Sequence, residues 1–206
     1  MQSKNHWEHV YASKGANTVS WYQEHAERSL KLIRATGVAR SEPVIDVGGG
    51  ASTLIDDLLA DGYSDLTVID LSAAALAAAR TRLGAQAAAV HWLEADITTV
   101  KMPRRHYAVW HDRAVFHFLT TAEERAAYLG AVFHAVRPGG YVIVATFAED
   151  GPAQCSGLPV QRYSADSLHA EFGEAFTLLE HETETHRTPS GTLQQFVYCF
   201  CRKVGC

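Results

Sequence analysis

Short apolar runs alternate with stretches of helical periodicity along most of the chain. Apolar runs typical of buried strands end near residues 47, 70, 96, 112 and 147. Apolar residues recur at helical intervals over about 25–35, 54–59, 73–83, 121–136 and 164–172. Two more strands, about 176–185 and 193–202, follow at the end, and the last one alternates Phe196, Tyr198 and Phe200 with Val197, Cys199 and Cys201. This alternation of strands and helices predicts an α/β fold.

The stretch from Val44 to Leu54 has the pattern of a strand, a tight turn and the start of a helix. The run Val44-Ile-Asp-Val contains Asp46 as its only polar residue, and three glycines, Gly48, Gly49 and Gly50, follow it. Glycine lacks a Cβ atom, so the backbone can adopt positive φ here and a ligand can approach it closely. The helix that follows would direct free N–H groups and its positive dipole end at the turn. We expect a cofactor in this turn; the alternative is a glycine turn without a ligand.

Two common nucleotide-binding fingerprints fit this turn poorly. The dinucleotide pattern G-x-G-x-x-G needs a glycine where Thr53 stands, and the phosphate-binding loop needs a lysine that is not nearby. The pattern D-x-G-x-G, with Asp70 at the end of the next strand, instead resembles the class I S-adenosylmethionine-dependent methyltransferases. The spacing between Asp46 and Asp70 is close to the about 20 residues expected for a carboxylate that reaches ribose hydroxyls.

A second motif extends the resemblance to about residues 40–147. Arg137-Pro-Gly-Gly140 leads into the apolar run 141–147, and Pro138 and Gly139 suit the central positions of a type II turn. The resemblance implies one methyltransferase domain over 1–206, a three-layer Rossmann-like sandwich. Its seven-stranded, mostly parallel sheet should have the order 3-2-1-4-5-7-6 with an antiparallel last strand and helices on both faces. Within it, residues 1–40 would form an aromatic lid and helix, 41–206 the core, and 148–163 a loop at the acceptor site.

The resemblance also implies S-adenosyl-L-methionine as the cofactor and assigns residues to it. Asp70 would bind the ribose, with Leu71 as a further cofactor residue, while Asp96 would receive the adenine amino group and the Ile97 amide would meet the ring. The remaining expected cofactor residues are Asp46, Gly48, Gly49, Gly50 and His111. For Asp96, the alternative is a helix cap or a turn residue.

Three polar residues, His111, Asp112 and Arg113, stand where the fourth strand should end. Ligands of open α/β sheets bind at this edge, and buried polar groups are costly unless they pair or serve a ligand. We therefore predict that these three residues are catalytic and that His111 and Asp112 face the methyl acceptor. The alternative is an ion pair between Asp112 and Arg113 that fixes the loop, with His111 satisfied by the backbone.

The N-terminal two dozen residues are dense in aromatic side chains without a strong period. Trp7, Tyr11, Lys14, Trp21 and Tyr22 lie before the first helix. Such residues form either a flap packed on the core or a lid over a pocket, where electron-rich ring faces would stabilise a sulfonium. We expect Trp7, Tyr11, Trp21 and Tyr22 to contact the substrate.

The loop 148–163 is long and rich in glycine and proline, and we expect it to cover the acceptor site. Its candidate contacts are Cys155, Arg162 and Tyr163, although Cys155 could equally be an idle thiol. His117 is a further candidate for substrate binding, and its apolar neighbours favour a packing role as the alternative.

The composition of the chain limits the kinds of partner that we expect it to bind. The chain has 206 residues, 47% hydrophobic and 20% charged, with a net charge of −5 and a pI near 6.1. This balance argues against nucleic acid as the main partner, and neither a signal peptide nor a membrane-spanning run is evident. We expect a cytoplasmic protein, a monomer or homodimer, with no membrane partner, reduced cysteines and no metal.

The activity that we expect is transfer of a methyl group to a small-molecule acceptor, with a thiol, sulfide or other soft nucleophile as the preferred class. A protein-lysine N-methyltransferase is the first alternative. The second, from another class, is an NAD- or nucleotide-binding oxidoreductase or a non-catalytic cofactor-binding protein.

Overall fold

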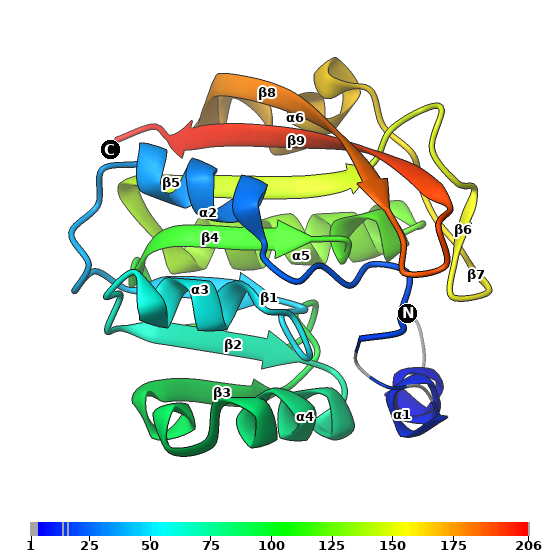
Figure 1. The fold of residues 1–206 in the computed structure, drawn as a ribbon. Helices are drawn as coiled ribbons and strands as arrows, with labels where there is room; N and C mark the ends of the chain where they lie inside the picture. Colours follow the sequence, from blue (N-terminus) through cyan, green and yellow to red (C-terminus); the bar gives the residue numbers. More distant parts are fainter. Residues whose placement is uncertain (1–3, 14, 16, 206) are drawn as a thin grey trace.

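A seven-stranded sheet runs through the protein, as Figure 1 shows for the computed structural model. The structure describes residues 4–13, 15 and 17–205. The parallel strands are β1 (Val44–Val47), β2 (Leu66–Asp70), β3 (Val90–Glu94), β4 (Tyr107–Arg113) and β5 (Val136–Phe147). Two antiparallel strands, β8 (Phe176–Arg187) and β9 (Leu193–Lys203), complete the sheet. The order β3-β2-β1-β4-β5-β9-β8 confirms the predicted topology.

Helices cover both faces of this sheet. On one face lie α2 (Glu27–Ala35), α3 (Leu54–Ala60) and α4 (Ala73–Leu83), and on the other α5 (Ala122–Ala135) and α6 (Ala165–Phe172). Short 3-10 turns occupy Gly84–Ala89, Phe116–Phe118 and Gly173–Ala175. Side-chain caps start the later helices, because Ser72 accepts a hydrogen bond at α4 and Thr121 forms a capping box at α5.

Side chains of successive strand residues enter different cores, as the strand period requires. On β9, Phe196, Tyr198 and Phe200 join the core beneath α2 and α3, and the alternate residues Val197, Cys199 and Cys201 join the core beneath α5 and α6. The predicted alternation of this strand is therefore confirmed. The described cysteines, Cys155, Cys199 and Cys201, are buried free thiols.

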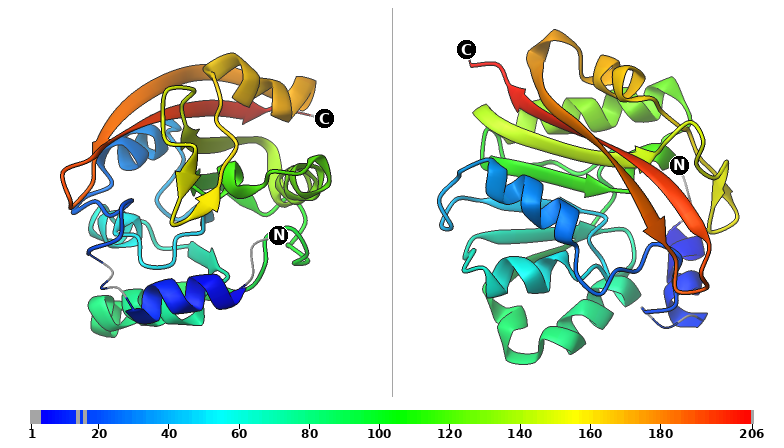
Figure 2. Two further views of the ribbon diagram at one scale, coloured as in Figure 1. Left: turned by 90° about the vertical axis from the view of Figure 1, so that its right-hand side faces the viewer. Right: turned by 45° about the horizontal axis from the view of Figure 1, so that its top comes forward.

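Two elements at the carboxyl edge of the parallel strands differ from the sequence prediction. The aromatic N-terminal stretch contains a helix, α1 (Lys4–Ser13), in which Val10 is the buried residue, so it has no broad apolar stripe that periodicity could reveal. The loop 148–163 contains a small hairpin, β6 (Gln154–Cys155) and β7 (Leu158–Pro159). Figure 2 (left) looks onto this edge, with α1 below and the hairpin above it.

Three element boundaries also differ. Helix α2 begins at Glu27 instead of His25, and β3 ends at Glu94, which leaves Asp96 in the loop that follows. Strand β5 begins at Val136 instead of Tyr141, because Val136 already pairs with Tyr107 before a register shift. Within the described part of the chain, no helix combines the length and the apolar character needed to cross a bilayer.

Candidate active site

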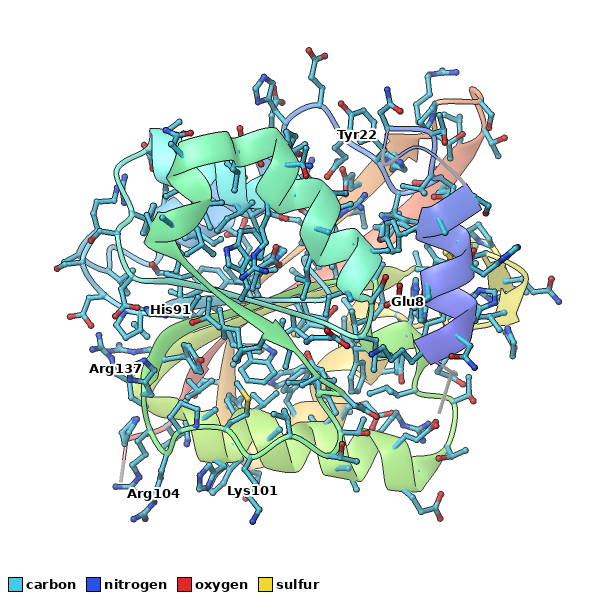
Figure 3. All side chains as sticks on the ribbon, turned by 90° about the horizontal axis from the view of Figure 1, so that it is seen from below. Glu8, Tyr22, His91, Lys101, Arg104 and Arg137 are labelled. Carbon is cyan, nitrogen blue, oxygen red and sulfur yellow. The ribbon has the colours of Figure 1, made fainter. Side chains whose placement is uncertain are left out.

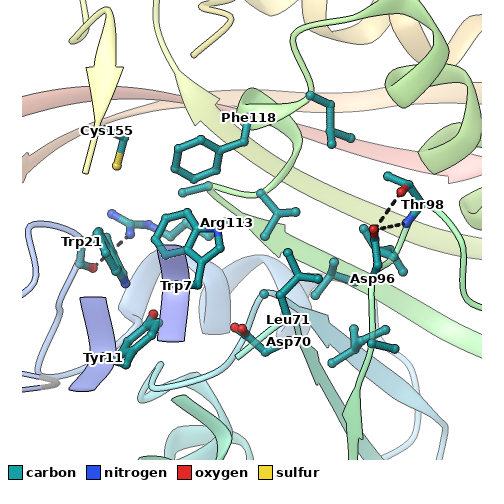
Figure 4. A pocket seen from close by; sticks show the side chains of 18 residues that line it. Trp7, Tyr11, Trp21, Asp70, Leu71, Asp96, Thr98, Arg113, Phe118 and Cys155 are labelled. Atoms are coloured by element: carbon teal, nitrogen blue, oxygen red, sulfur yellow. Dashed lines mark hydrogen bonds between the residues drawn. The ribbon is translucent and has the colours of Figure 1, made fainter. Parts of the chain in front are cut away.

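A cavity opens where β1, β2 and β4 end, at the edge where the sequence predicts a cofactor (Figure 4). We call it the main cavity; it measures about 860 Å³ including the part open to solvent. A second cavity, the side cavity, measures about 530 Å³ on the same basis, and Trp21, Gly48 and Arg113 line both. The two cavities are therefore neighbours at the glycine turn.

The glycine turn brings bare backbone against its neighbours. Gly48 has a φ of 67°, and a Cβ atom there would lie 2.0 Å from Cγ2 of Val115. A Cβ at Gly49 would lie 2.3 Å from Oδ2 of Asp46, and one at Gly50 would lie 2.4 Å from Oδ2 of Asp70. Only glycine fits at these three positions without displacement of its neighbours.

Asp70 and Asp96 present carboxylates to the main cavity from neighbouring strand ends (Figure 4). Oδ1 of Asp70 accepts a hydrogen bond from the Ser72 backbone N–H at 2.8 Å, and burial raises the pKa of Asp70 to about 6. Oδ1 of Asp96 accepts from both the N–H and the hydroxyl of Thr98, at 2.8 and 2.7 Å. Oδ2 of Asp96 is buried and has no partner among the described residues. Asp96 is thus a turn residue that also keeps one oxygen available for a ligand.

His111 lies beside Asp46, its register partner across β1 and β4. Its Nδ1 lies 2.6 Å from Oδ1 of Asp46, and its Nε2 lies 2.8 Å from Oγ of Ser29 on α2. The three residues are buried and line the side cavity. Both imidazole nitrogens are therefore engaged, by side chains and not by the backbone as the alternative interpretation supposed. We call this chain of groups the Asp46–His111–Ser29 chain.

Asp112 lies on the opposite face of the sheet from His111 and lines neither cavity. Its carboxylate accepts hydrogen bonds from the backbone N–H groups of Val115 and Phe116, at 2.8 and 3.1 Å, and from the Tyr128 hydroxyl at 2.6 Å. Burial raises the pKa of Asp112 to about 6. The structure does not place Asp112 where it could face the acceptor, and it forms no ion pair with Arg113; it fixes the turn after β4 instead.

Arg113 lies at the junction of the two cavities and is held on all sides. Its guanidinium donates to the Tyr198 hydroxyl at 3.0 Å and to the Trp21 carbonyl at 3.2 Å, and it lies 3.4 Å from a carboxylate oxygen of Glu184. The guanidinium carbon lies 4.2 Å from the centre of the Phe196 ring. Arg113 thereby holds the backbone at Trp21 in place through the Trp21 carbonyl.

Aromatic side chains form the outer wall of the main cavity, and Figure 4 shows them facing Asp70 across the space. The rings of Trp7 and Phe118 pack edge to face at 5.1 Å, and those of Trp7 and Trp21 at 5.8 Å. We call Trp7, Trp21 and Phe118 the aromatic wall. Tyr11 packs against Trp21, and Cys155 completes the wall from the hairpin.

Two ionisable groups next to the aromatic wall, Tyr11 and Cys155, keep their protons. Burial raises the pKa of the Cys155 thiol to about 12, and burial likewise raises the pKa of the Tyr11 hydroxyl. Both groups are therefore protonated near neutral pH and neither is poised as a base.

Other predicted substrate contacts lie elsewhere. Tyr22 lines the side cavity, and Arg162 donates to the Gly151 carbonyl at 3.1 Å within its own loop. His117 is buried between Phe118 and Phe147, accepts from the Phe147 N–H, and has a pKa that burial lowers to about 3. Neither His117 nor Arg162 lines either cavity. Tyr163 packs into the core beneath α5 and α6, and Lys14 lies outside the described residues.

Helix α1 reaches the cavity through a contact that the sequence did not reveal. The Glu8 carboxylate accepts hydrogen bonds from the N–H groups of Ala73 and Ala74, at 2.6 and 3.3 Å, at the start of α4. Lys4 pairs with Glu94 at the end of β3. Figure 3 shows Glu8 on the inner side of α1. These two contacts hold α1, with Trp7 and Tyr11, over the main cavity.

Ser29, Glu8 and Glu184 are site residues that sequence reasoning missed. Each belongs to an ordinary polar position of a helix or an edge strand and meets its partner only in the folded chain. The Glu8 carboxylate, for example, adds to the Ser72 cap of α4 by accepting from Ala73, 65 residues away in sequence.

Comparisons with known sequences agree with this geometry. A family model described as a methyltransferase domain matches residues 44–140. An uncharacterized methyltransferase of Mycobacterium bovis is 33% identical over 127 residues, which are 62% of this chain and 60% of that protein. The eEF1A lysine and N-terminal methyltransferase of Mus musculus is 24% identical over 153 residues, 71% of this chain but 22% of that protein. The chain thus spans less than two thirds of the length of these relatives.

Solved structures share the whole fold. One solved structure concerns the conversion of a disulfide bond into a thioacetal group during echinomycin biosynthesis. It has a TM-score of 0.79 at 20% identity, and the alignment covers 98% of this chain and 92% of that chain. The N-methyltransferase NodS of Bradyrhizobium japonicum, in complex with S-adenosyl-L-homocysteine, has a TM-score of 0.70 at 18% identity and covers 95% and 97%. At these identities the likeness establishes the architecture.

Proposed function

The chain belongs to the class I S-adenosylmethionine-dependent methyltransferase family, and we propose that it methylates a small molecule at a soft atom such as the sulfur of a thiol or sulfide. Family membership makes the chain an enzyme that uses S-adenosylmethionine, so the oxidoreductase and non-catalytic alternatives are not retained. One observation carries the acceptor proposal. Among the described residues that line the main cavity beside the aromatic wall, none is available as a base.

The residues present fit the cofactor. The unpartnered Oδ2 of Asp46 suits an ammonium group, Asp70 suits the ribose hydroxyls, and the unpartnered Oδ2 of Asp96 suits an adenine amino group. Gly48, which lines both cavities, would lie against the part of the ligand between them. When bound, S-adenosylmethionine supplies a methyl group on a positively charged sulfur.

Each candidate base is occupied or protonated. Both nitrogens of His111 are engaged in the Asp46–His111–Ser29 chain, and Arg113 is a paired cation. Cys155 and Tyr11 retain their protons because burial raises the pKa of each. An acceptor such as an amine cation or an alcohol would need a group to take its proton. A thiolate or a sulfide arrives with an available electron pair and needs none.

The chain's own residues then contribute alignment and exclusion of water. The aromatic wall and α1 cover one side of the cavity and exclude water there, which raises the reactivity of a thiolate that loses its hydration on binding. Ring faces also attract a soft cation, worth about 0.5–2 kcal/mol for each well-placed ring. Arg113 holds the Trp21 segment in position through the Trp21 carbonyl.

Label transfer from methyl-labelled S-adenosylmethionine tests the proposal. The acceptor panel contains small thiols and sulfides, amines of matched size, and lysine peptides. We expect label in the sulfur products, and loss of the aromatic wall by Trp7→Ala should lower kcat/KM for them by about 10-fold or more. The matched control is Trp92→Ala, because Trp92 lies on β3 and lines neither cavity. Label in amines or peptides alone would refute the proposal.

A protein lysine is the second candidate acceptor. The alignment with the mouse eEF1A lysine and N-terminal methyltransferase over 153 residues is the observation that favours it. A lysine side chain would have to enter past α1 and lose its proton beside the aromatic wall, where the described lining offers no available base. The peptide arm of the same assay decides between the two candidates.

A further inference from the structure

The Asp46–His111–Ser29 chain has a role that neither the fold nor the family match assigns. We infer that Ser29 and His111 are positioning residues that hold one oxygen of Asp46 toward the ammonium group at the amino-acid end of S-adenosylmethionine. This inference rests on the cofactor and is independent of the acceptor.

The topology brings the three groups to one face of the sheet. Asp46 and His111 are register partners on adjacent parallel strands, so their side chains project to the same side. Helix α2 covers that side and supplies Ser29. All three side chains are almost fully buried, with 3%, 2% and 1% of Asp46, His111 and Ser29 exposed.

The hydrogen bonds have a direction. The Asp46 carboxylate accepts, so Nδ1 of His111 donates to it over 2.6 Å. Nε2 of the neutral imidazole then accepts a 2.8 Å hydrogen bond from the Ser29 hydroxyl. Asp46, whose carboxylate can only accept, fixes the tautomer of His111, Ser29 fixes the orientation of its ring, and His111 fixes the rotamer of Asp46.

The second oxygen of Asp46 is left over. Oδ2 is buried and without a partner among the described residues; it lies where a Cβ of Gly49 would stand, and Asp46 lines the side cavity. A buried, unpartnered carboxylate oxygen is unfavourable unless a cationic donor arrives. The ammonium of the amino-acid end is such a donor, and Asp46 is the carboxylate that lines the side cavity.

The same order of carboxylate, imidazole and hydroxyl occurs in serine hydrolases, where the hydroxyl is a nucleophile. The two roles differ in what Ser29 does chemically. A nucleophile gives its proton to the imidazole and reacts with an electrophilic probe, whereas a positioning hydroxyl donates a hydrogen bond to the imidazole and keeps its proton.

The test is isothermal titration of the full chain with three ligands. S-adenosylhomocysteine carries the ammonium and the carboxylate, its decarboxylated analogue keeps the ammonium alone, and 5′-methylthioadenosine lacks both. His111→Leu should weaken the two ammonium ligands by about 10- to 100-fold, the value of one hydrogen bond to a charged group, and leave methylthioadenosine unchanged. Ser29→Ala should give a smaller loss of about 3- to 10-fold with the same ligand pattern.

Two further variants sharpen the result. His111→Asn retains an N–H donor for Asp46 and should recover most of the affinity that His111→Leu loses. The matched control is Tyr128→Phe, which removes a hydrogen bond to the buried carboxylate of Asp112 on the other face of the sheet. Tyr128→Phe should lower the unfolding temperature without discriminating among the three ligands.

Equal loss for all three ligands in His111→Leu or Ser29→Ala overturns the inference, as does a covalent adduct on Ser29 after treatment with a fluorophosphonate probe. If His111→Leu does not fold, Ser29→Ala decides alone. Unchanged affinity of Ser29→Ala for S-adenosylhomocysteine then overturns the inference.

Discussion

The hydroxyl of Tyr128 donates a 2.6 Å hydrogen bond to the carboxylate of Asp112, one residue after His111 but on the opposite face of the sheet. Tyr128 in turn accepts from the Trp110 indole N–H at 2.9 Å. Two adjacent polar residues of one strand therefore have separate tasks. His111 serves the cofactor side, and Asp112 holds the turn that follows β4.

Asp112→Asn should give a stability difference that depends on pH. The pKa of Asp112 is raised by burial to about 6 from 3.8, so between these values the folded state binds a proton that the unfolded state does not. Asp112 therefore adds stability to the wild type as pH falls from 7 to 5, a contribution that the asparagine variant lacks. Denaturant titrations at both pH values should show a larger destabilisation at pH 5; a constant or smaller difference contradicts the assignment.

Gly48→Ala should destabilise the protein more than Gly62→Ala. Both glycines have positive φ, 67° and 87°, but nothing lies within 4 Å of a Cβ at Gly62, whereas a Cβ at Gly48 meets Val115 at 2.0 Å. The left-handed backbone alone costs about 1–2 kcal/mol, and overpacking adds about 1–3 kcal/mol. Free energies of unfolding for the two variants measure the difference. Equal values would show that the approach of Val115 to the turn is not tight.

Glu8→Ala should loosen α1 without unfolding the sheet. Glu8 accepts from the first N–H groups of α4, a capping contact worth about 1 kcal/mol. Hydrogen exchange of residues 4–13 should speed up in this variant, while exchange in β1 and β4 stays unchanged. Glu149→Ala, at an exposed position after β5, is the control. Identical hydrogen exchange of residues 4–13 in both variants would show that Glu8 does not hold α1 in place.

Asp70 should make affinity for adenosine ligands depend on pH. Its pKa is raised by burial to about 6, so it is mainly protonated at pH 5 and loses acceptor capacity for the ribose hydroxyls. Methylthioadenosine should bind the wild type more weakly at pH 5 than at pH 7, and Asp70→Asn should bind weakly at both. Calorimetry at the two pH values checks this. A pH dependence that persists in Asp70→Asn would assign it to another group.

The glycine turn could be predicted because its parts are local, whereas the sheet order was predicted from the resemblance to the methyltransferase family. A strand, three glycines and a helix start are consecutive in sequence, and Asp70 follows at the next strand end. The opposite directions of His111 and Asp112 also follow from the strand period, which the sequence prediction did not apply when it grouped them as one catalytic set. Because their side chains alternate, only His111 reaches a cavity.

The remaining site contacts depend on tertiary structure. Ser29 meets His111 across 82 residues of sequence, and Arg113 meets Glu184 across 71. No spacing rule links such positions. Helix α1 has a weak pattern because its aromatic residues face a cavity instead of a core, so its periodicity could not reveal it.

The most direct test of the base-free acceptor side is a competition between 2-naphthalenethiol and 2-naphthol at pH 7, which share one skeleton. A hydroxyl with a pKa near 10 is about one part in 1000 ionised at pH 7, whereas a thiol ionises far more readily. With no base on the aromatic wall, kcat/KM should favour the thiol by about 100-fold or more. Equal or preferential methylation of the naphthol would show that the cavity supplies a base and would contradict the account.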